Sequence, residues 1–188
     1  MDALLTTFLA AALSEWGDKT WLLVVALSAR FGRPRAVLAG VALAALLNSL
    51  LAAGAGLVIH GYITLRAISL LVALALLFAG VAGFLRPAAP DRNARWRGGP
   101  FAASFFAFFV LEFGDKTQFV TMSLAAQFNT LGLAAAGATA GILAAAIPAA
   151  LLGREAQAAI PTRGLRYAAA AIFTIAGLIV AVNALRLV

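Results

Sequence analysis

The residues best suited to chemistry in this chain occur in two nearly identical groups. Residues 15–21 read EWGDKTW and residues 112–118 read EFGDKTQ, so each group carries a glutamate, an aspartate, a lysine and a threonine in the same order. Carboxylate, hydroxyl and amide oxygens are hard ligands, which suit Ca²⁺, Mg²⁺ and Mn²⁺ and suit soft metals poorly. The two groups together predict a site for a hard divalent cation.

The candidate ligands are the acids and the neutral oxygen donors of both groups. We expect metal contacts from Glu15, Asp18, Thr20, Glu112, Asp115, Thr117 and Gln118. A protonated lysine has no lone pair to offer, so we expect Lys19 and Lys116 to tune the charge and to hold the carboxylates apart when the metal leaves. Asn48 and Met122 are candidate accessory ligands, although a helix–helix hydrogen bond and ordinary packing are the simpler interpretations.

Each group is surrounded by apolar sequence, so the spacing of its charged residues determines which of them can contact one another. Residues three and four apart share a helix face, so we expect Glu15 to lie on the same side as Asp18 and Lys19. Gly17 and Gly114 allow the backbone to bend or another helix to approach closely. A break at these glycines would expose peptide carbonyls as further oxygen ligands.

The elements that position these groups are transmembrane helices. The 188-residue chain is 64% hydrophobic and only 11% charged, with a mean hydropathy of +1.01, whereas a soluble domain has about 45–50% apolar and about 25% charged residues. Its Ala, Leu and Gly content favours packed helices over a β-barrel. The sequence predicts an all-α integral membrane protein with six transmembrane helices, at 3–29, 35–59, 64–85, 101–127, 131–152 and 165–187.

The second group follows the first by 97 residues, and the neighbouring sequence matches at the same offset. Further identities at that offset pair Leu27 with Leu124, Ala29 with Ala126, Phe31 with Phe128, Ala39 with Ala136, and Gly40 with Gly137. Chance similarity in Ala-rich and Leu-rich sequence is the alternative, and the shared E-x-G-D-K-T string argues against it. We expect a three-helix repeat at 1–85, a cytoplasmic linker at 86–100, and a second repeat at 101–188 that is inverted because three is odd.

The distribution of basic residues predicts the orientation. Ten arginines outside the two groups lie near the three expected loops of one side, and two lie on the other, at Arg66 and Arg186. The positive-inside rule places the ten in the cytoplasm and both termini outside. Because the net charge of +7 is located at helix ends, it indicates contact with membrane lipid and no nucleic-acid partner. The absence of cysteine excludes disulfides and thiolate metal sites.

Both groups lie near the middle of their expected helices, where charge is costly. Glu15 is about 18 Å into the first helix at 1.5 Å per residue, and a central Asp or Lys costs about 2.5–3.5 kcal/mol on an insertion scale. The charges must therefore face the interior of the bundle and find partners there. Purely structural Glu–Lys pairs are the alternative, but two copies at matching depth favour a functional site.

These two motifs resemble the signature of the Gdt-type cation/proton exchanger family, which includes the Golgi manganese/calcium transporter and bacterial manganese exporters. The family pattern, E-x-G-D-[KR]-[TS], is intact at 15–20 and 112–117. The resemblance implies Mn²⁺ and/or Ca²⁺ transport coupled to protons, with Glu15, Asp18, Glu112 and Asp115 as ligands. The cation is cargo, and no cofactor or enzymatic activity is expected. The short basic linker departs from the longer acidic one of many eukaryotic members. The compact Ala- and Arg-rich chain suggests a bacterial inner membrane and efflux.

Three other functions are compatible with parts of the sequence. An intramembrane aspartyl protease would use a G-x-G-D motif, but glutamate replaces the first glycine here and no Tyr-Asp partner motif exists. A small-solute or amino-acid exporter can also use three-helix repeats. A passive divalent-cation channel is poorly separated from an exchanger by sequence.

Overall fold

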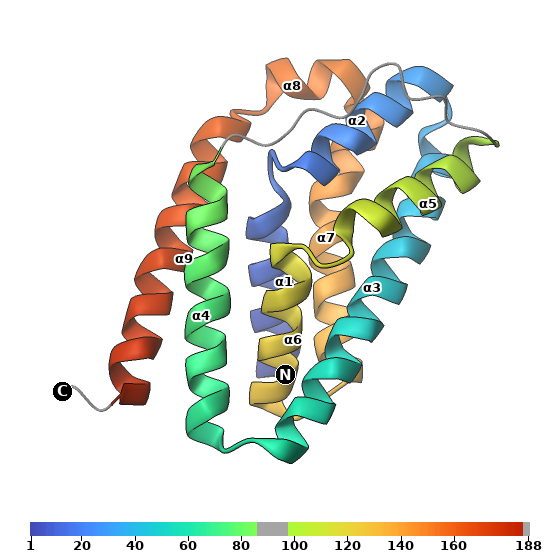
Figure 1. Ribbon diagram of the computed structural model, residues 1–188. Coiled ribbons are helices and arrows are strands. Elements are labelled where there is room, and N and C mark those ends of the chain that lie inside the picture. The colour runs from blue at the N-terminus through green and yellow to red at the C-terminus, as the bar shows by residue number, and fades with distance from the viewer. Residues whose placement is uncertain (86–97, 186–188) are drawn as a thin grey trace.

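The computed structural model describes residues 1–85 and 98–185, and every regular element within those ranges is a helix (Figure 1). The predicted all-helical fold is therefore confirmed. The linker expected at 86–100 falls largely outside the described residues, since α5 begins at Pro100. In chain order, the helices are α1 (Asp2–Glu15), α2 (Lys19–Phe31), α3 (Pro34–Tyr62), α4 (Leu65–Phe84), α5 (Pro100–Glu112), α6 (Lys116–Phe128), α7 (Gly132–Leu152), the short α8 (Ala156–Ala159) and α9 (Thr162–Leu185).

Four of these helices, α3, α4, α7 and α9, are long and apolar enough to cross a membrane. The two other expected spans, 3–29 and 101–127, are not continuous helices. Each is divided in the middle, into α1 and α2 and into α5 and α6. A helix of 14 residues is about 21 Å long at 1.5 Å per residue, which is shorter than the ~30 Å hydrocarbon core of a bilayer. The prediction of continuous helices at these two places is wrong, because a glycine turn interrupts each of them.

The ends of the elements follow from local sequence. The helix α2 stops at Gly32 with a left-handed φ of 60°, and α6 stops 97 residues later at Asn129 with a φ of 48°. Glycine and asparagine are the residues that adopt this conformation most readily at helix C-termini. Proline occupies the first position of α3 and α5, where a missing N–H has no cost.

Helices pack closely where glycine removes a side chain. A Cβ atom built on Gly40 of α3 would lie 3.1 Å from the Ser104 Cβ of α5, and one on Gly137 of α7 would lie 3.1 Å from the Leu4 carbonyl carbon of α1. One built on Gly177 of α9 would lie 2.8 Å from the Leu77 Cγ of α4. Close approach at small residues is the usual packing mode of membrane helices. The contacts of α3 with α5 recur, 97 residues on, in those of α7 with α1.

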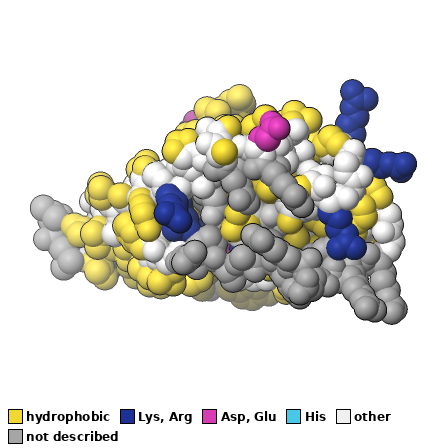
Figure 2. Space-filling model, turned by 90° about the horizontal axis from the view of Figure 1, so that it is seen from above, with side chains coloured by type: hydrophobic (Ala, Val, Ile, Leu, Met, Phe, Trp, Pro, Cys, Tyr) yellow, Lys and Arg dark blue, Asp and Glu magenta, His cyan; other side chains and the backbone are white. Residues whose placement is uncertain are grey.

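Figure 1 shows how these contacts arrange the bundle. The helices α4 and α9 lie side by side on one flank, α1 and α6 occupy the middle, and α3 and α7 lie on the other flank. From the two breaks, α2 and α5 run obliquely toward the same end of the molecule, where α8 also lies. Lys and Arg side chains project at that end (Figure 2). The arrangement brings both glycine turns to the centre of the bundle.

Candidate functional site

Each motif forms a turn that interrupts a helix. Trp16 has a φ of −63° and a ψ of 116°, Gly17 has a φ of 72°, and the Asp18 N–H donates to the Glu15 carbonyl oxygen over 3.2 Å. The second copy repeats this geometry, with a φ of 74° at Gly114 and a corresponding hydrogen bond of 3.0 Å. These values match a type II β-turn, which requires a positive φ at its third residue. Glycine at that position is therefore a backbone requirement.

The two turn glycines differ in what surrounds them, which leads to a first prediction. Gly114→Ala is expected to lower the free energy of unfolding by about 1–2 kcal/mol, because only the left-handed backbone is strained; its Cβ would meet nothing within 4 Å among the described residues. Gly17→Ala is expected to cost more, because its Cβ would lie 2.8 Å from the Thr162 Cβ as well. Thermal unfolding of both variants in detergent measures the difference, and equal losses would contradict it.

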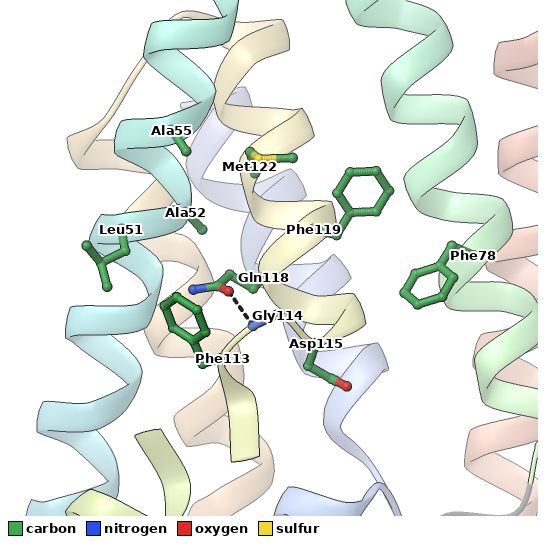
Figure 3. A pocket seen from close by; sticks show the side chains of 10 residues that line it. All are labelled: Leu51, Ala52, Ala55, Phe78, Phe113, Gly114, Asp115, Gln118, Phe119 and Met122. Carbon is green, nitrogen blue, oxygen red and sulfur yellow. Dashed lines mark hydrogen bonds between the residues drawn. The ribbon is translucent and has the colours of Figure 1, made fainter. Parts of the chain in front are cut away.

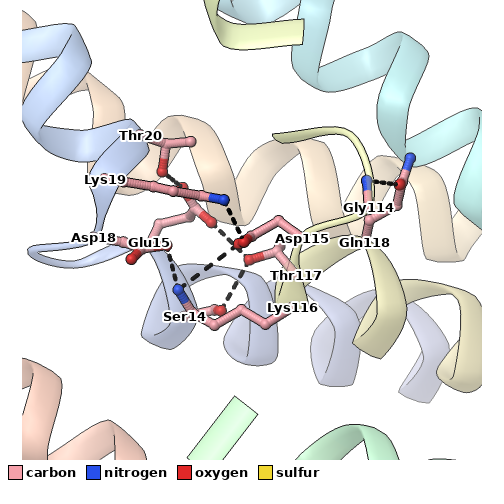
Figure 4. A network of polar contacts seen from close by, with 10 residues as sticks. All are labelled: Ser14, Glu15, Asp18, Lys19, Thr20, Gly114, Asp115, Lys116, Thr117 and Gln118. Carbon is pink, nitrogen blue, oxygen red and sulfur yellow. Dashed lines mark hydrogen bonds and ion pairs between the residues drawn. The ribbon is translucent and has the colours of Figure 1, made fainter. Parts of the chain in front are cut away.

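Two ion pairs join the motifs crosswise (Figure 4). The Lys19 Nζ lies 2.7 Å from the Asp115 Oδ1, and the Lys116 Nζ donates to the Asp18 Oδ2. Lys116 also lies 3.8 Å from the Asp115 Oδ2. Each aspartate precedes a helix, α2 or α6, yet in the described structure neither side chain caps that helix. The aspartates bind the lysine of the opposite motif instead, so the two motifs meet at the centre of the molecule.

The carboxylate of Glu15 is held by hydroxyl groups. Thr20 donates to Oε2 over 2.6 Å and Thr117, from the other motif, donates to Oε1 over 2.7 Å. The Thr117 oxygen also lies 2.9 Å from the Ser14 hydroxyl. Both threonines that the sequence predicts as metal ligands therefore serve the same glutamate in this structure. Glu15 itself is 2% exposed.

Glu112 is equally buried but has no such support. Its exposure is 1%, and no hydrogen-bond donor among the described residues reaches either carboxylate oxygen. It lines a narrow cavity with five polar residues, which in this state has no room for a water molecule. An unpaired buried carboxylate is costly, so Glu112 is a candidate to bind a cation or a proton. The polar residues beside it are Asn48, Ser49, Thr117, Gln118 and Thr121.

Gln118 separates this narrow cavity from a wider, open pocket. The Gln118 Oε1 accepts the Gly114 N–H over 2.6 Å, and its Nε2 lies 3.5 Å from the Asn48 Oδ1. The open pocket has a volume of about 380 Å³ and is lined by Asp115, Gln118, Met122 and mostly apolar neighbours (Figure 3). Asn48 makes the helix–helix hydrogen bond that was the simpler expectation, from its Nδ2 to the Phe109 carbonyl oxygen over 3.2 Å.

The structure brings the predicted site residues together without arranging them around one point. Among the described residues, no three His, Cys, Asp or Glu side chains form a group that could hold a metal ion. Asp18, Asp115 and Glu15 are engaged by lysines and hydroxyls instead, and Glu112 alone of the four acids has no such partner among the described residues. Sequence reasoning missed Ser14, Ser49 and Thr121. The last two carried a signal, because Ser49 adjoins Asn48 and Thr121 lies one helical turn after Thr117.

Comparison with known proteins identifies the family. The family described as "Divalent cation/proton antiporter GDT1" matches residues 3–91 and 100–187. The chain belongs to this family. The match confirms the resemblance carried by the two motifs, and the four long apolar helices fit a membrane protein.

One curated relative of this GDT1 family chain gives a second comparison. A protein of Vibrio cholerae serotype O1 named "Putative manganese exporter" is 37% identical over 130 residues, which cover 67% of this chain. The matched region spans 63% of that relative, less than two thirds of its length. No solved structure gives a significant match.

Proposed function

We propose that this protein exchanges a divalent cation, Mn²⁺ and/or Ca²⁺, for protons by alternating access and exports the cation from the cytoplasm. The observation that carries the proposal is the meeting of both E-x-G-D-K-T motifs in one buried, crosswise-paired cluster. The family description supports cation/proton antiport, and the name of the relative favours manganese.

The chain is proposed to consist of two inverted repeats, at 1–85 and 101–188. In this arrangement α1 and α2 correspond to α5 and α6, α3 corresponds to α7, and α4 corresponds to α9. Equivalent contacts support it: the Thr7 hydroxyl donates to the Ala3 carbonyl over 2.7 Å, and the Ser104 hydroxyl, 97 residues later, donates to the Pro100 carbonyl over 2.6 Å. Inverted repeats place cation sites near the bilayer midplane, between the two halves.

The charge of the cluster supplies a reason for exchange. Four carboxylates and two lysines carry a formal charge of −2. One divalent cation or two protons neutralise that charge, whereas the empty site keeps it in the middle of the bilayer, where uncompensated charge is costly. If the protein changes its access state only when this cluster is neutral, each change must carry either one divalent cation or two protons across the membrane. This condition makes transport an obligatory exchange.

The two turns differ in a way that alternating access requires. The turn at Gly17 is covered by the first residue of α9, Thr162, while the turn at Gly114 borders the open pocket. The pocket is lined mainly by residues of α3 and by residues of α6 that follow the break at Gly114. Arg30 belongs to the last turn of α2 and Arg163 to the first turn of α9, and both of these helix ends lie at the opposite end of the bundle (Figure 1). With that end in the cytoplasm by the positive-inside rule, the protein would sit in a bacterial inner membrane with both termini outside, and this state would be open outward.

A cysteine pair tests that state. Met122 lines the open pocket, and Val25, its counterpart 97 residues earlier, is 2% exposed. Because the native chain has no cysteine, Met122→Cys and Val25→Cys each introduce a single thiol. A membrane-impermeant thiol reagent added outside is expected to label Met122→Cys faster, as followed by mass shift. Faster labelling of Val25→Cys would contradict the assigned state.

Transport itself separates the exchanger from a channel. An exchanger in sealed proteoliposomes moves Mn²⁺ against its concentration gradient when a pH gradient is imposed, because proton flow supplies the free energy. A passive channel only equilibrates Mn²⁺. An amino-acid or small-solute exporter would move neither Mn²⁺ nor Ca²⁺.

A further inference from the structure

Each motif glutamate lines its own narrow cavity, and the two cavities occupy matching positions. We call them the Glu112 chamber, with Asn48, Ser49, Gln118 and Thr121, and the Glu15 chamber, with Trp21, Val24, Ala145 and Ala146. At an offset of 97, each of these residues of one chamber corresponds to one of the other. The paired cavities therefore allow a position-by-position comparison of their chemistry.

That comparison shows that only one chamber offers side-chain oxygen ligands besides its glutamate. Where the Glu112 chamber has Asn48 and Ser49, the Glu15 chamber has two alanines. Where the first has Gln118 and Thr121, the second has Trp21 and Val24. Among the described residues, the buried indole N–H of Trp21 has no hydrogen-bond partner, and an indole can only donate. Such a group cannot bind a metal, so the Glu15 chamber offers a cation no side-chain oxygen besides its glutamate.

We propose that the divalent cation is coordinated in the Glu112 chamber alone, by Glu112, Asn48, Gln118 and the hydroxyls of Ser49 and Thr121. This inference rests on the proposed function and assigns its cargo to one half of the site. Ser49 and Thr121 are new ligands that neither motif contains. A hard cation such as Mn²⁺ takes an octahedral set of oxygens. This chamber supplies one carboxylate, two amides and the hydroxyls of Ser49 and Thr121, while the third hydroxyl of its lining, Thr117, donates to Glu15.

The existing hydrogen bonds leave the Thr121 and Glu112 oxygens available, whereas the Gln118 Oε1 and the Asn48 Oδ1 accept N–H donors that an entering cation must displace. The Thr121 hydroxyl donates its proton to the Thr117 carbonyl over 2.8 Å, which keeps its oxygen lone pairs for a cation. The Asn48 amide nitrogen is taken by Phe109, so its carbonyl oxygen faces Gln118. Glu112 has both oxygens unpaired within the described structure, whereas the two Glu15 oxygens already accept hydroxyl donors. The Glu15 carboxylate is therefore hydrogen-bonded to protein groups, whereas both oxygens of Glu112 remain available to bind a cation.

Charge balance is consistent with this assignment. The crosswise pairs of Lys19 with Asp115 and of Lys116 with Asp18 are each neutral. The two glutamates then carry the remaining −2, which one divalent cation offsets. Access also favours this chamber, because Gln118 lines both it and the open pocket, while the Glu15 chamber shares no lining residue with that pocket. Entry of the cation requires the Gln118 side chain to release the Gly114 N–H.

The test exchanges single polar groups between chambers. The double variant Ser49→Ala/Thr121→Val gives the Glu112 chamber the residues of its counterpart, with almost no change in volume. The matched control, Ala146→Ser/Val24→Thr, makes the reverse change in the Glu15 chamber. Isothermal titration of purified protein with MnCl₂ gives the dissociation constant. We expect the first variant to raise it about tenfold or more, by loss of two oxygen ligands, and the control to leave it unchanged.

The outcomes separate this inference from the proposed function. If the native protein neither binds nor transports Mn²⁺ or Ca²⁺, the proposed function fails. If it does both, and Ser49→Ala/Thr121→Val binds like the native protein or the control weakens binding equally, the single-chamber assignment is overturned. Thr121→Ser guards against a folding defect, because it keeps the hydroxyl and should bind Mn²⁺ more tightly than Thr121→Val. Equal binding by Thr121→Ser and Thr121→Val would also overturn the assignment.

Discussion

Glu112→Gln is expected to reduce proton-driven Mn²⁺ flux to background while leaving the protein folded. The substitution removes the charge of the site acid whose two oxygens both lack a donor within the described structure. An amide keeps the size of the side chain but offers one oxygen instead of a charged pair. Because an unpaired buried charge costs more than a buried amide, we expect the melting temperature of the variant to be no lower than that of the native protein.

The control for this variant is Glu155→Gln, the same chemical change at an exposed glutamate beyond α7. It should transport Mn²⁺ at the native rate. Flux into proteoliposomes and thermal unfolding in detergent measure activity and stability separately. Native flux in Glu112→Gln would remove Glu112 from the site, and a large loss of stability would mean that its charge has a structural partner.

Asp18→Asn is expected to lower the free energy of unfolding by about 3–5 kcal/mol, because it leaves the buried Lys116 ammonium without its closest partner. Lys116 and Asp18 side chains are 8% and 12% exposed. Lys19→Gln should cost less, because the Lys19 side chain is 29% exposed and solvent screens its pair with Asp115. Equilibrium unfolding in detergent provides both values.

A double-mutant cycle isolates the pair itself. Asp18→Asn/Lys116→Gln removes both charges and should recover most of the stability that either single variant loses, since no uncompensated charge remains. Transport should not recover, because the motif acid is still absent. If the losses of unfolding free energy in the two single variants simply add in the double variant, Asp18 and Lys116 do not stabilise the fold through their mutual interaction.

Much of the architecture follows from composition and spacing. Long apolar stretches predict the helices, and the E-x-G-D-K-T motif repeated at an offset of 97 predicts that both copies belong to one site. The contacts of Thr117 with Glu15 and of Lys19 with Asp115 place the motifs together as that repeat suggested. Glycine in each motif allowed the break that the structure contains, because a type II turn needs a positive φ there.

The partners of the charged residues could not be predicted in the same way. The expectation that Glu15 and Lys19 share a helix face assumes a continuous helix, and the turn between them removes that register. Each lysine therefore pairs most closely with the aspartate of the opposite motif, which only tertiary structure reveals. The difference in polar side chains between the two chambers, by contrast, could be predicted from the sequence. Comparing Asn48 with Ala145 and Thr121 with Val24 at the repeat offset shows it.

The central claim is that the cation moves only in exchange for protons. The most direct measurement loads proteoliposomes at acidic pH, dilutes them into alkaline buffer that contains Mn²⁺, and records internal Mn²⁺ and internal pH together. We predict uptake of Mn²⁺ above its external concentration, with a simultaneous rise of internal pH, and loss of both signals in Glu112→Gln. Mn²⁺ entry at the same rate after the pH gradient is collapsed, without any proton counter-flow, would contradict exchange and establish a passive channel.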